Sequence, residues 1–505
     1  MKSTRLRASA SLLGFAALLC GCTVGPDFLV PEAPKETGYR AEGEAATVGE
    51  QHLDLGKQIA GDWWSLYHSE ELSEVVRQAI AGNRTLAAAE AALAQAQEAV
   101  AQATGGLYPQ LDLNGSATRL RNPPQALGLQ RLPPGFPAIF NLFSIGPRVS
   151  YLLDIFGGTR RGIEQASALA EAADHEVDAA YLSLTGNAVN QALAVASINA
   201  QIRTVQGIIA EDETNLRLVN DEVNAGVATQ LDIETARSQL AADRTLLPPL
   251  RQQSSVARHA LAILIGKPPV DWTPPKFDLA DFTLPNNLPV SLPSTLVRQR
   301  PDILTAEAQL HAASAAIGVA TAQLYPSITL SAGTNQEATT VSQLFWGSSN
   351  AWSMAAGLTA PIFHGGELEA QRSAAVDAYD AAMAKYQETV LDAFDQVADV
   401  LDALQHDAEL IDEEHRALEA AEASLRLTRT TYSIGNVGIL QVVDAQRLVE
   451  QARLGFVRAQ AQRLVDTAQL FLAMGGGWWD WQAHNPGAAA TQTAPQPVSV
   501  PAPPK

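Results

Sequence analysis

The sequence predicts a mainly helical chain built from two similar halves, each of which carries a pair of β-strands. Long segments rich in Ala, Leu, Gln and Glu place apolar residues three and four positions apart, which favours helices. Shorter segments alternate apolar and polar residues, which favours strands. These features occur twice in the same order along the 505 residues, so we expect one structural unit repeated in tandem.

The repeat is visible in the sequence itself. "NRTLAAAEAAL" at 83–93 matches "RPDILTAEAQL" at 300–310, and "LYP" occurs at 107–109 and at 324–326. The spacing between matched positions is 217 residues before the strands and 208 to 209 after them. The change falls in the Pro-rich connector 117–146, which is about ten residues longer than its counterpart. A constant order with one shift in spacing indicates a tandem duplication.

The helical segments combine high helix propensity with helical periodicity. The predicted helices are 70–105, roughly 159–224 and 229–266 in the first half, and 297–323, roughly 367–433 and 438–473 in the second. A helix of about 65 residues is roughly 100 Å long, far longer than a globular domain needs. Pro248-Pro249 is expected to interrupt or kink the first returning helix.

The strands are predicted at about 109–119, 147–156, 327–336 and 351–363. Segments of about ten residues with a period of two suit membrane β-strands, although a half-buried soluble sheet has the same pattern. Phe156 and Phe363 could form an aromatic girdle or pack in a core. The predicted helix–strand junctions are Tyr108, Pro109, Gly157, Gly158, Tyr325, Pro326, Gly365 and Gly366.

The number of strands predicts an oligomer if they enter a membrane. A closed barrel leaves no backbone edge unpaired, and single-chain barrels begin at about eight strands. Four strands cannot close one, whereas two copies supply eight and three supply twelve. The long helices of the same copies would then form a second cylinder outside the membrane.

The N-terminus resembles a bacterial lipoprotein signal. Basic residues precede the apolar run "SLLGFAALLCG", and "LLCGC" fits a lipobox with Cys22 as the lipidated residue, better than it fits Cys20. Cleavage before Cys22 would remove three basic residues and change the net charge from −20 to −23. The mature chain would have no cysteine for a disulfide. No later segment approaches the 18 apolar residues typical of a membrane helix.

Composition and motifs exclude several classes of function. The net charge is −20 and the basic residues are nowhere concentrated, which argues against nucleic acid as a partner. The chain lacks H-E-x-x-H, G-x-S-x-G and phosphate-loop motifs. We therefore expect no enzyme, no catalytic residue, no metal, and no cofactor other than the covalent lipid on Cys22.

An ordered series of motifs resembles one family. "CTVGPDF", "DWW" at 62–64, "RPDI" at 300–303, the paired "LYP" joins, "VVDAQR" at 442–447 and "MGGGWW" at 474–479 look like the NodT/OprM-like branch of the TolC-type outer-membrane efflux proteins. The match covers about 22–480. It implies a homotrimer with a twelve-stranded β-barrel in the outer membrane, continuous with a long periplasmic α-helical barrel and a mixed equatorial domain.

The resemblance also implies a function and partners. The protein is expected in the outer membrane of a Gram-negative bacterium, anchored by lipid and extending into the periplasm. It would be the exit duct of a tripartite efflux pump, exporting drugs or other toxic small molecules. Its partners would be a periplasmic adaptor, outer-membrane lipid, and an inner-membrane transporter of the resistance–nodulation–division type.

Gate residues are implied by the match to "VDAQR". Asp444 and Arg447 match the family's gate aspartate and arginine, Leu440 matches the apolar constriction, and Tyr432 matches a tyrosine that ties neighbouring helices together. Three copies of Asp444 around a threefold axis would form a negative ring that favours cations. Arg447 could form a lock across the subunit interface. The alternative is an ordinary solvated charge pair on a helix.

The first half has Thr235 and Ser238 at the corresponding positions. If the halves alternate around the mouth, only the second hairpin is expected to be charged there. The expected adaptor-docking turns are Gly226-Val227 and Gly435-Asn436-Val437. Asn436 departs from the Gly-Val start that is commoner in the family.

The predicted segments are a signal peptide at 1–21, an N-terminal extended or equatorial segment at 22–69, the first repeat at 70–275, a linker at 276–296, the second repeat at 297–480, and a disordered Pro/Ala-rich tail at 481–505. Two other hypotheses remain open. One is a lipidated periplasmic coiled-coil scaffold without a pore, and the other is a periplasmic hydrolase.

Overall fold

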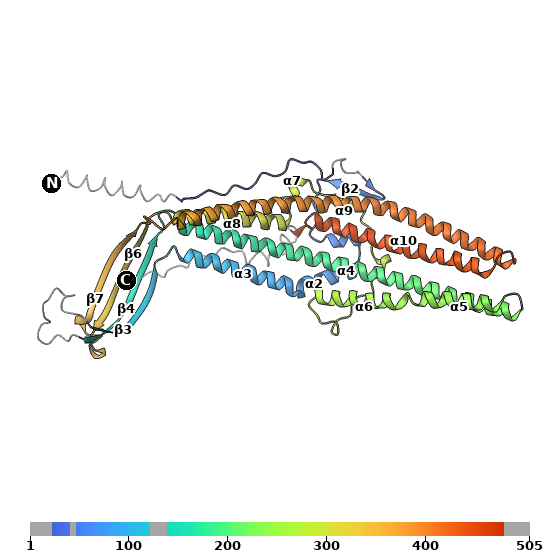
Figure 1. The fold of residues 1–505 in the computed structure, drawn as a ribbon, viewed down its shortest axis with the longest axis horizontal. Coiled ribbons are helices and arrows are strands. Elements are labelled where there is room, and N and C mark those ends of the chain that lie inside the picture. The colour runs from blue at the N-terminus through green and yellow to red at the C-terminus, as the bar shows by residue number, and fades with distance from the viewer. Residues whose placement is uncertain (1–22, 41–46, 122–138, 479–505) are drawn as a thin grey trace. The chain divides into compact units, whose positions relative to one another are not determined.

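The computed structural model describes residues 23–40, 47–121 and 139–478 (Figure 1). The predicted signal peptide, Cys22 and the predicted tail lie outside these residues. The chain forms two compact units. The first, here the sheet unit, comprises Met1–Val30, Ala94–Ala172 and Ala306–Lys385. The second, here the helical unit, comprises Pro31–Leu93, Ala173–Thr305 and Tyr386–Lys505.

Helices make up most of the structure. They are α2 (Glu70–Gly82), α3 (Arg84–Gly105), α4 (Gly158–Asn224), α5 (Gln230–Arg244), α6 (Leu247–Leu264), α7 (Pro293–Leu296), α8 (Pro301–Ala322), α9 (Glu367–Ser433) and α10 (Ile439–Ala473). The strands are β1 (Thr47–Val48), β2 (Gln51–Leu55), β3 (Gln110–Arg121), β4 (Ile139–Leu153), β5 (Asn287–Val290), β6 (Ser327–Ala338) and β7 (Asn350–Thr359). The helices α4 and α9 each contain 67 residues. Within the described residues, none of the helices is both long enough and apolar enough to cross a membrane.

The sheet unit contains one antiparallel sheet with the strand order β3-β4-β6-β7. The hairpin β3–β4 pairs Gln110 with Ser150, and the hairpin β6–β7 pairs Ser327 with Thr359. The two hairpins are joined through β4 and β6, where Val149 lies opposite Ala332. The sheet therefore places strands from both halves of the chain next to each other.

The strand β4 corrects the predicted range 147–156, because it starts at Ile139 and ends at Leu153. Its first eight residues lie in the segment interpreted as a Pro-rich connector. Pro147 lies inside the strand opposite Leu113 of β3, and the pairing with β6 is interrupted at Gly146 and Pro147. A proline lacks the N–H that this pairing needs, while the neighbouring residues restore the ladder. Phe156 therefore lies beyond the end of β4. Phe363 lies beyond β7, which ends at Thr359 and not at 363 as predicted.

The two edge strands expose large apolar side chains. Every residue of β7 is exposed, as is nearly every residue of β3. The exposed apolar residues of these strands include Leu111, Leu113, Trp352, Met354 and Leu358, with exposed fractions of 69% to 78%. An edge strand also has one row of backbone groups without a neighbour in the sheet. The single chain thus leaves two apolar edges uncovered within its described residues.

The N-terminal segment after residue 22 is held within the sheet unit by Arg161. The Arg161 guanidinium donates to the Val24 carbonyl at 3.1 Å and to the carboxylates of Asp27 and Glu164 at 2.7 Å each. Its side chain is only 4% exposed. Nearby, the ring of Phe28 stacks on His311 with centroids 4.5 Å apart. The segment is therefore packed against α4 and α8.

The helical unit has a core at the level of a small three-stranded sheet, β1-β2-β5. The side chains of Trp63 and Tyr67, in the 3₁₀ turn Trp63–Tyr67, are fully buried there with Phe471 of α10. The Tyr67 hydroxyl donates to the Leu464 carbonyl at 2.8 Å. Since buried aromatic residues contribute large apolar areas, this core fixes the turn Trp63–Tyr67 against α10.

Two predicted helices are interrupted in the structure, and a third is shorter than predicted. The range 70–105 is divided between α2 and α3 at Asn83, whose side chain accepts from the N–H groups of Thr85 and Leu86 and so caps α3. The range 229–266 is divided between α5 and α6 just before Pro248-Pro249, because a proline is tolerated only in the first turn of a helix. The range 297–323 contains only α8, which starts at Pro301.

Candidate functional site: the hairpin ends and the helices behind them

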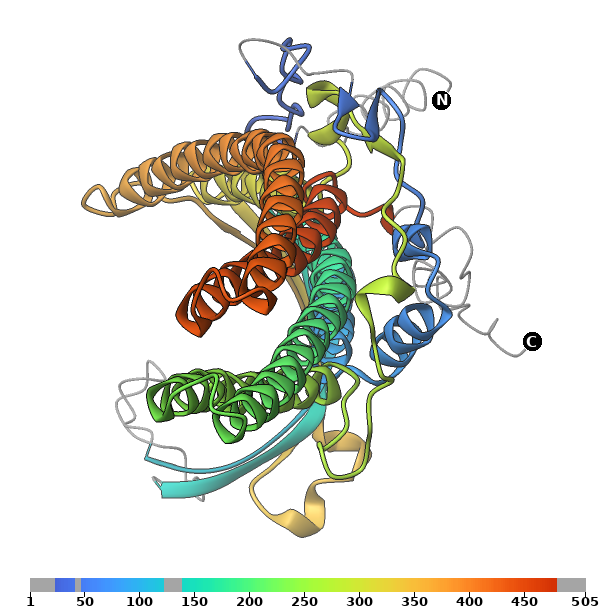
Figure 2. The same ribbon diagram turned by 90° about the vertical axis from the view of Figure 1, so that its right-hand side faces the viewer.

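The site lies where α4 turns into α5 and where α9 turns into α10. Figure 2 shows these two hairpins from their turns, with α4 and α5 in green and α9 and α10 in orange and red. Both turns contain the same hydrogen bonds. Gly226 donates to Val223 and Val227 to Glu222, while Gly435 donates to Tyr432 and Asn436 to Thr431. This is the Schellman pattern, and it requires the positive φ of Gly226 (75°) and Gly435 (77°).

A small apolar core holds the ends of the hairpins together. It contains residues from all four helices, namely Val219, Ile233, Ala236, Leu425, Ile439, Val442, Ala445 and Val449. Ala236 and Ala445 are small residues on α5 and α10, which allow these two helices to approach. The ends of the hairpins are therefore a packed four-helix arrangement in the single chain.

The residues assigned to the gate from the family resemblance lie on the exposed side of α10. Leu440 is 57% exposed, although it is a large apolar residue. Asp444 Oδ1 and Arg447 Nη2 are 3.7 Å apart, and both side chains are more than half exposed. The contact lies within one chain, between residues one helical turn apart. The structure thus aligns all three residues along α10, while their role in a gate stays a prediction.

Tyr432 connects the two hairpins. Its hydroxyl, at the end of α9, donates to the carboxylate of Glu222 at the end of α4. Burial and the Glu222 carboxylate raise the pKa of Tyr432 above its usual range, so the hydroxyl remains a donor. The sequence had assigned Tyr432 but not Glu222, since the two residues are far apart in the chain.

The turns present apolar side chains to solvent. Val227 is 77% exposed and Ile434 is 67% exposed. Leu231 on the first turn of α5 is 74% exposed, on the same hairpin as Val227. Exposed apolar residues that gather at one end of a helical unit are typical of an interaction surface.

The first hairpin carries no charge at the two positions equivalent to Asp444 and Arg447. Thr235 and Ser238 are indeed uncharged, and the Thr235 hydroxyl donates to the Leu231 carbonyl of its own helix. One position earlier, however, Arg237 and Glu234 form an ion pair at 2.7 Å. This ion pair is displaced by one residue from the positions equivalent to Asp444 and Arg447. The expectation that only the second hairpin is charged at the gate therefore stays a prediction.

The predicted helix–strand junctions lie in the sheet unit. The ring of Tyr325 stacks on Phe156 with centroids 4.7 Å apart, while Tyr108 is 63% exposed. Pro109 and Pro326 lie between a helix and the next strand. Gly158 begins α4, and the other junction glycines have positive φ values, which are 78° for Gly157, 61° for Gly365 and 86° for Gly366. These values explain why glycine occurs where a strand turns into a long helix.

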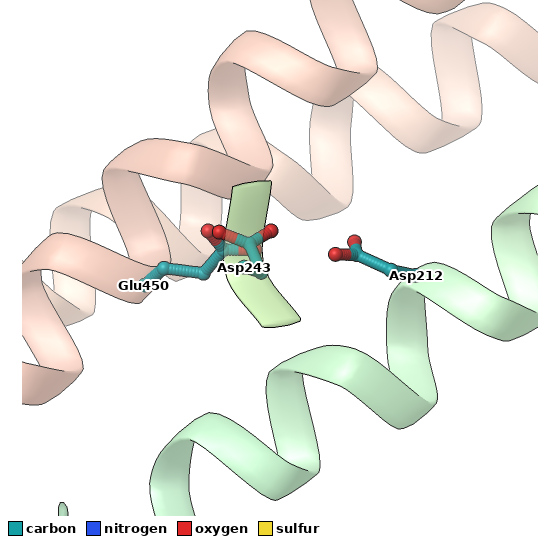
Figure 3. A group of neighbouring side chains, drawn as sticks. All are labelled: Asp212, Asp243 and Glu450. Atoms are coloured by element: carbon teal, nitrogen blue, oxygen red, sulfur yellow. The ribbon is translucent and has the colours of Figure 1, made fainter. Parts of the chain in front are cut away.

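Three buried carboxylates behind the hairpin ends were not found from the sequence. They are Asp212 of α4, Asp243 of α5 and Glu450 of α10 (Figure 3). One oxygen of each lies within 4.8 Å of the others. Burial and the neighbouring carboxylates raise the pKa of Asp212 to about 8 and that of Glu450 to about 7. The three residues are far apart in the sequence, so the sequence does not reveal that they meet. The only signal it offered is an acidic residue at a buried position of each helix.

Solved structures define the class of the protein. The fold is similar to that of the outer-membrane channel OprN, with a TM-score of 0.81 and 26% identity over 90% of this chain and 100% of that one. It is also similar to CusC (TM-score 0.79, 25% identity, 90% and 100% coverage) and to the Neisseria gonorrhoeae MtrE outer membrane channel (0.76, 25%, 90% and 99%). The fold is thus that of an outer-membrane channel.

The chain belongs to the outer membrane efflux protein family, which it matches over residues 75–267 and 292–476. It is 29% identical to the pyoverdine export outer membrane protein OpmQ of Pseudomonas aeruginosa over 95% of this chain and 97% of that protein. It is 27% identical to the cation efflux system protein CusC of Escherichia coli (92% and 97% coverage). It is 28% identical to nodulation protein T of Rhizobium leguminosarum bv. trifolii (92% and 96% coverage).

The family establishes the general role and location of the protein. It is an outer-membrane exit duct for efflux, located in the outer membrane. Its relatives are efflux channels rather than enzymes. Outer membrane efflux proteins of tripartite pumps form trimers and work with an adaptor and an inner-membrane transporter.

Proposed function

We propose that three copies of this chain form a gated duct in which the three four-stranded sheets close into one twelve-stranded barrel. The observation that carries this proposal is the pair of uncovered edges, β3 and β7. Both edges expose apolar side chains on strands whose outer backbone groups have no neighbour in the sheet. Pairing β3 of one copy with β7 of the next satisfies these groups, and a closed barrel leaves no edge.

The gate is proposed at the hairpin ends. Leu440, Asp444 and Arg447 lie in a row on the exposed side of α10. Around a threefold axis, Leu440 would narrow the mouth with apolar side chains and Asp444 would add a negative ring. The Arg447 side chain could exchange its own Asp444 for that of a neighbouring copy, which would lock the closed state.

The turns would dock the adaptor. The exposed side chains of Val227 and Ile434 and the two glycine turns offer an apolar surface with fixed backbone geometry. Lipidation at Cys22 would anchor the N-terminal segment in the outer membrane, directly before the part that Arg161 holds. The cargo would be a small molecule selected by the inner-membrane transporter, which we propose to be of the resistance–nodulation–division type.

Crosslinking tests the closure of the barrel. With Cys22 lipidated and Cys20 removed, the mature chain would have no free thiol, so Asn114→Cys on β3 and Ser353→Cys on β7 could be combined. A short bis-maleimide should then link chains into covalent trimers in isolated outer membranes. Each single variant serves as a control and should give no trimer. Monomers alone from the double variant would contradict the proposal.

Conductance tests the duct itself. The duct proposal predicts that the purified protein opens channels in a planar lipid bilayer. The alternative hypothesis, a lipidated coiled-coil scaffold without a pore, predicts that it opens none. Absence of any conductance from trimers of the purified chain would favour the scaffold.

A further inference from the structure

The carboxylate cluster behind the gate is buried among helices from both halves of the chain. Asp212, Asp243 and Glu450 are 3%, 6% and 7% exposed. In Figure 3, the carboxylates of Asp243 and Glu450 lie together, and Asp212 points toward them from α4. Three like charges at such close range repel one another strongly where water does not screen them. The repulsion is relieved either by protons on the carboxylates or by a bound cation.

Two oxygens of the cluster have unused acceptor capacity. Asp212 Oδ1 accepts from Gln446 at 2.9 Å, and Asp243 Oδ2 accepts from Gln239 at 2.8 Å. Asp212 Oδ2 and Glu450 Oε1 are buried and have no hydrogen-bond partner. Glu450 is more than nine-tenths buried and lies beside the other two carboxylates, so its unpartnered oxygen indicates a ligand there.

The nearby arginines do not neutralise the cluster by direct contact. Arg453 contacts the carboxylates of Glu211 at 3.0 Å and Glu422 at 3.1 Å. Arg447 lies near Asp444. Both arginines act on Glu450 only at longer range. Among the ion pairs of the described residues, none includes Asp212, Asp243 or Glu450.

The chemistry of the site favours a hard divalent cation. Carboxylate oxygens are the ligands that Ca²⁺, Mg²⁺ and Mn²⁺ prefer. Ca²⁺ binds oxygens at about 2.3–2.6 Å, so ligands on opposite sides of the ion are up to about 5 Å apart. The separation of 4.8 Å or less is compatible with this range.

We propose that Asp212, Asp243 and Glu450 bind one hard divalent cation of the size of Ca²⁺. The ion would use the unpartnered oxygens of Asp212 and Glu450 and one oxygen of Asp243. It would connect α4, α5 and α10 next to the apolar core of the hairpin ends. Asp444 and Arg447 precede Glu450 by six and three residues on α10. In the proposed duct, and resting on that proposal, the cation would hold α10 in place and oppose opening of the gate.

Calcium binding by the full chain tests the site. Trimer purified in detergent and stripped with a chelator would be titrated with Ca²⁺ by calorimetry, in the wild type, Asp212→Asn, Glu450→Gln and the control Glu409→Gln. Glu409 is an exposed acidic residue of α9. We expect one site per chain in the wild type and in the control, with affinity lowered at least tenfold in the other two variants. Equal binding by Glu450→Gln, or no binding by the wild type, would overturn the proposal.

Thermal melting separates the loss of binding from misfolding. The asparagine and glutamine variants remove a buried charge, so without Ca²⁺ they should melt at or above the wild-type temperature. Added Ca²⁺ should raise the melting temperature of the wild type and of Glu409→Gln only. If Ca²⁺ leaves all four proteins unchanged, the cluster shares protons instead of a cation, and the proposal fails.

Conductance distinguishes this site from the duct proposal. With Ca²⁺ bound, wild-type channels should open less often than chelator-treated ones, and Glu450→Gln should show no such response. Specific Ca²⁺ binding without this response would retain the site and reject its link to the gate. Channels that never conduct, with or without Ca²⁺, would reject the duct while leaving the binding result intact.

Discussion

The hydroxyl of Tyr432 donates a hydrogen bond to the carboxylate of Glu222, and this bond joins the last turn of α9 to the last turn of α4. It connects the two hairpins at the level of their turns, beside the apolar core that both share. A tyrosine hydroxyl bound to a carboxylate forms a charge-assisted hydrogen bond, which is stronger than a neutral one. Its position makes it a candidate for holding the hairpins in their present arrangement.

Replacing Tyr432 by Phe should loosen the hairpin ends. The substitution keeps the ring and removes the donor, so a bond to a charged group worth about 1.5–3 kcal/mol is lost. We expect wild-type trimer formation and a higher probability of channel opening in bilayers. Tyr379→Phe, on the part of α9 within the sheet unit, is the matched control. An unchanged opening probability in Tyr432→Phe would show that this bond does not restrain the gate.

Neutralising Asp444 or Arg447 should change conduction with little effect on stability. Both side chains are largely exposed, and exposed ion pairs contribute little to the free energy of unfolding. Asp444→Asn should reduce the preference for cations, while Arg447→Gln should raise the opening probability. Single-channel recordings at low salt would measure both, because screening weakens such effects at high salt.

The ion pair on α5 provides a control for this prediction. Arg237→Gln removes a similar exposed charge next to Glu234 on the other hairpin. If the gate involves the α10 residues in particular, this variant should conduct like the wild type. Identical effects of Arg237→Gln and Arg447→Gln would show that only the total charge near the mouth matters.

The stability of the helical unit should decrease as the pH rises from about 4 to about 8. Burial and the neighbouring Asp466 raise the pKa of Asp407 to about 7, although Arg463 and His406 oppose this shift. An unfolded aspartate has a pKa of about 3.9. Between these two pKa values the folded state binds one proton more than the unfolded state does. The stabilisation from this proton is complete below the unfolded pKa and is lost as the pH rises through the folded pKa.

Asp407→Asn tests the source of this pH dependence. The amide is neutral at every pH, so the variant should show a shallower decline of unfolding free energy between pH 4 and pH 8, measured by urea denaturation with chelator present. Asp412→Asn replaces an exposed aspartate of the same helix and should behave like the wild type. If the unfolding free energy of Asp407→Asn declines as steeply as that of the wild type, groups other than Asp407 cause the pH dependence.

Removing the Arg161 side chain should free the N-terminal segment. Arg161→Met keeps the apolar stem but loses the bonds to Val24, Asp27 and Glu164. Hydrogen bonds to charged groups contribute about 1.5–3 kcal/mol each when buried, and less here because Asp27 is 91% exposed. We expect faster proteolysis within residues 23–30, measured by mass spectrometry. Arg77→Met, on the exposed side of α2, should leave the cleavage rate unchanged.

Local sequence patterns were sufficient for the three longest helices and for the turns. The predicted range 367–433 has the same bounds as α9, since a long run of good helix formers between two glycine turns needs no tertiary information. The glycines at 226 and 435 likewise follow from backbone geometry, because only glycine adopts positive φ without strain. The candidate gate residues came from a motif, and the structure places them on one exposed helix side.

Tertiary structure decided which distant residues meet. The sequence predicted a strand that begins at Pro147, but pairing with β3 and β6 extends β4 through this proline toward Ile139. The contact between Tyr432 and Glu222 and the meeting of Asp212, Asp243 and Glu450 depend on how the hairpins pack. Helix propensity and turn geometry depend on a few neighbouring residues, so the sequence by itself determined them. Strand order and buried charge clusters depend on side chains that only the folded chain brings together.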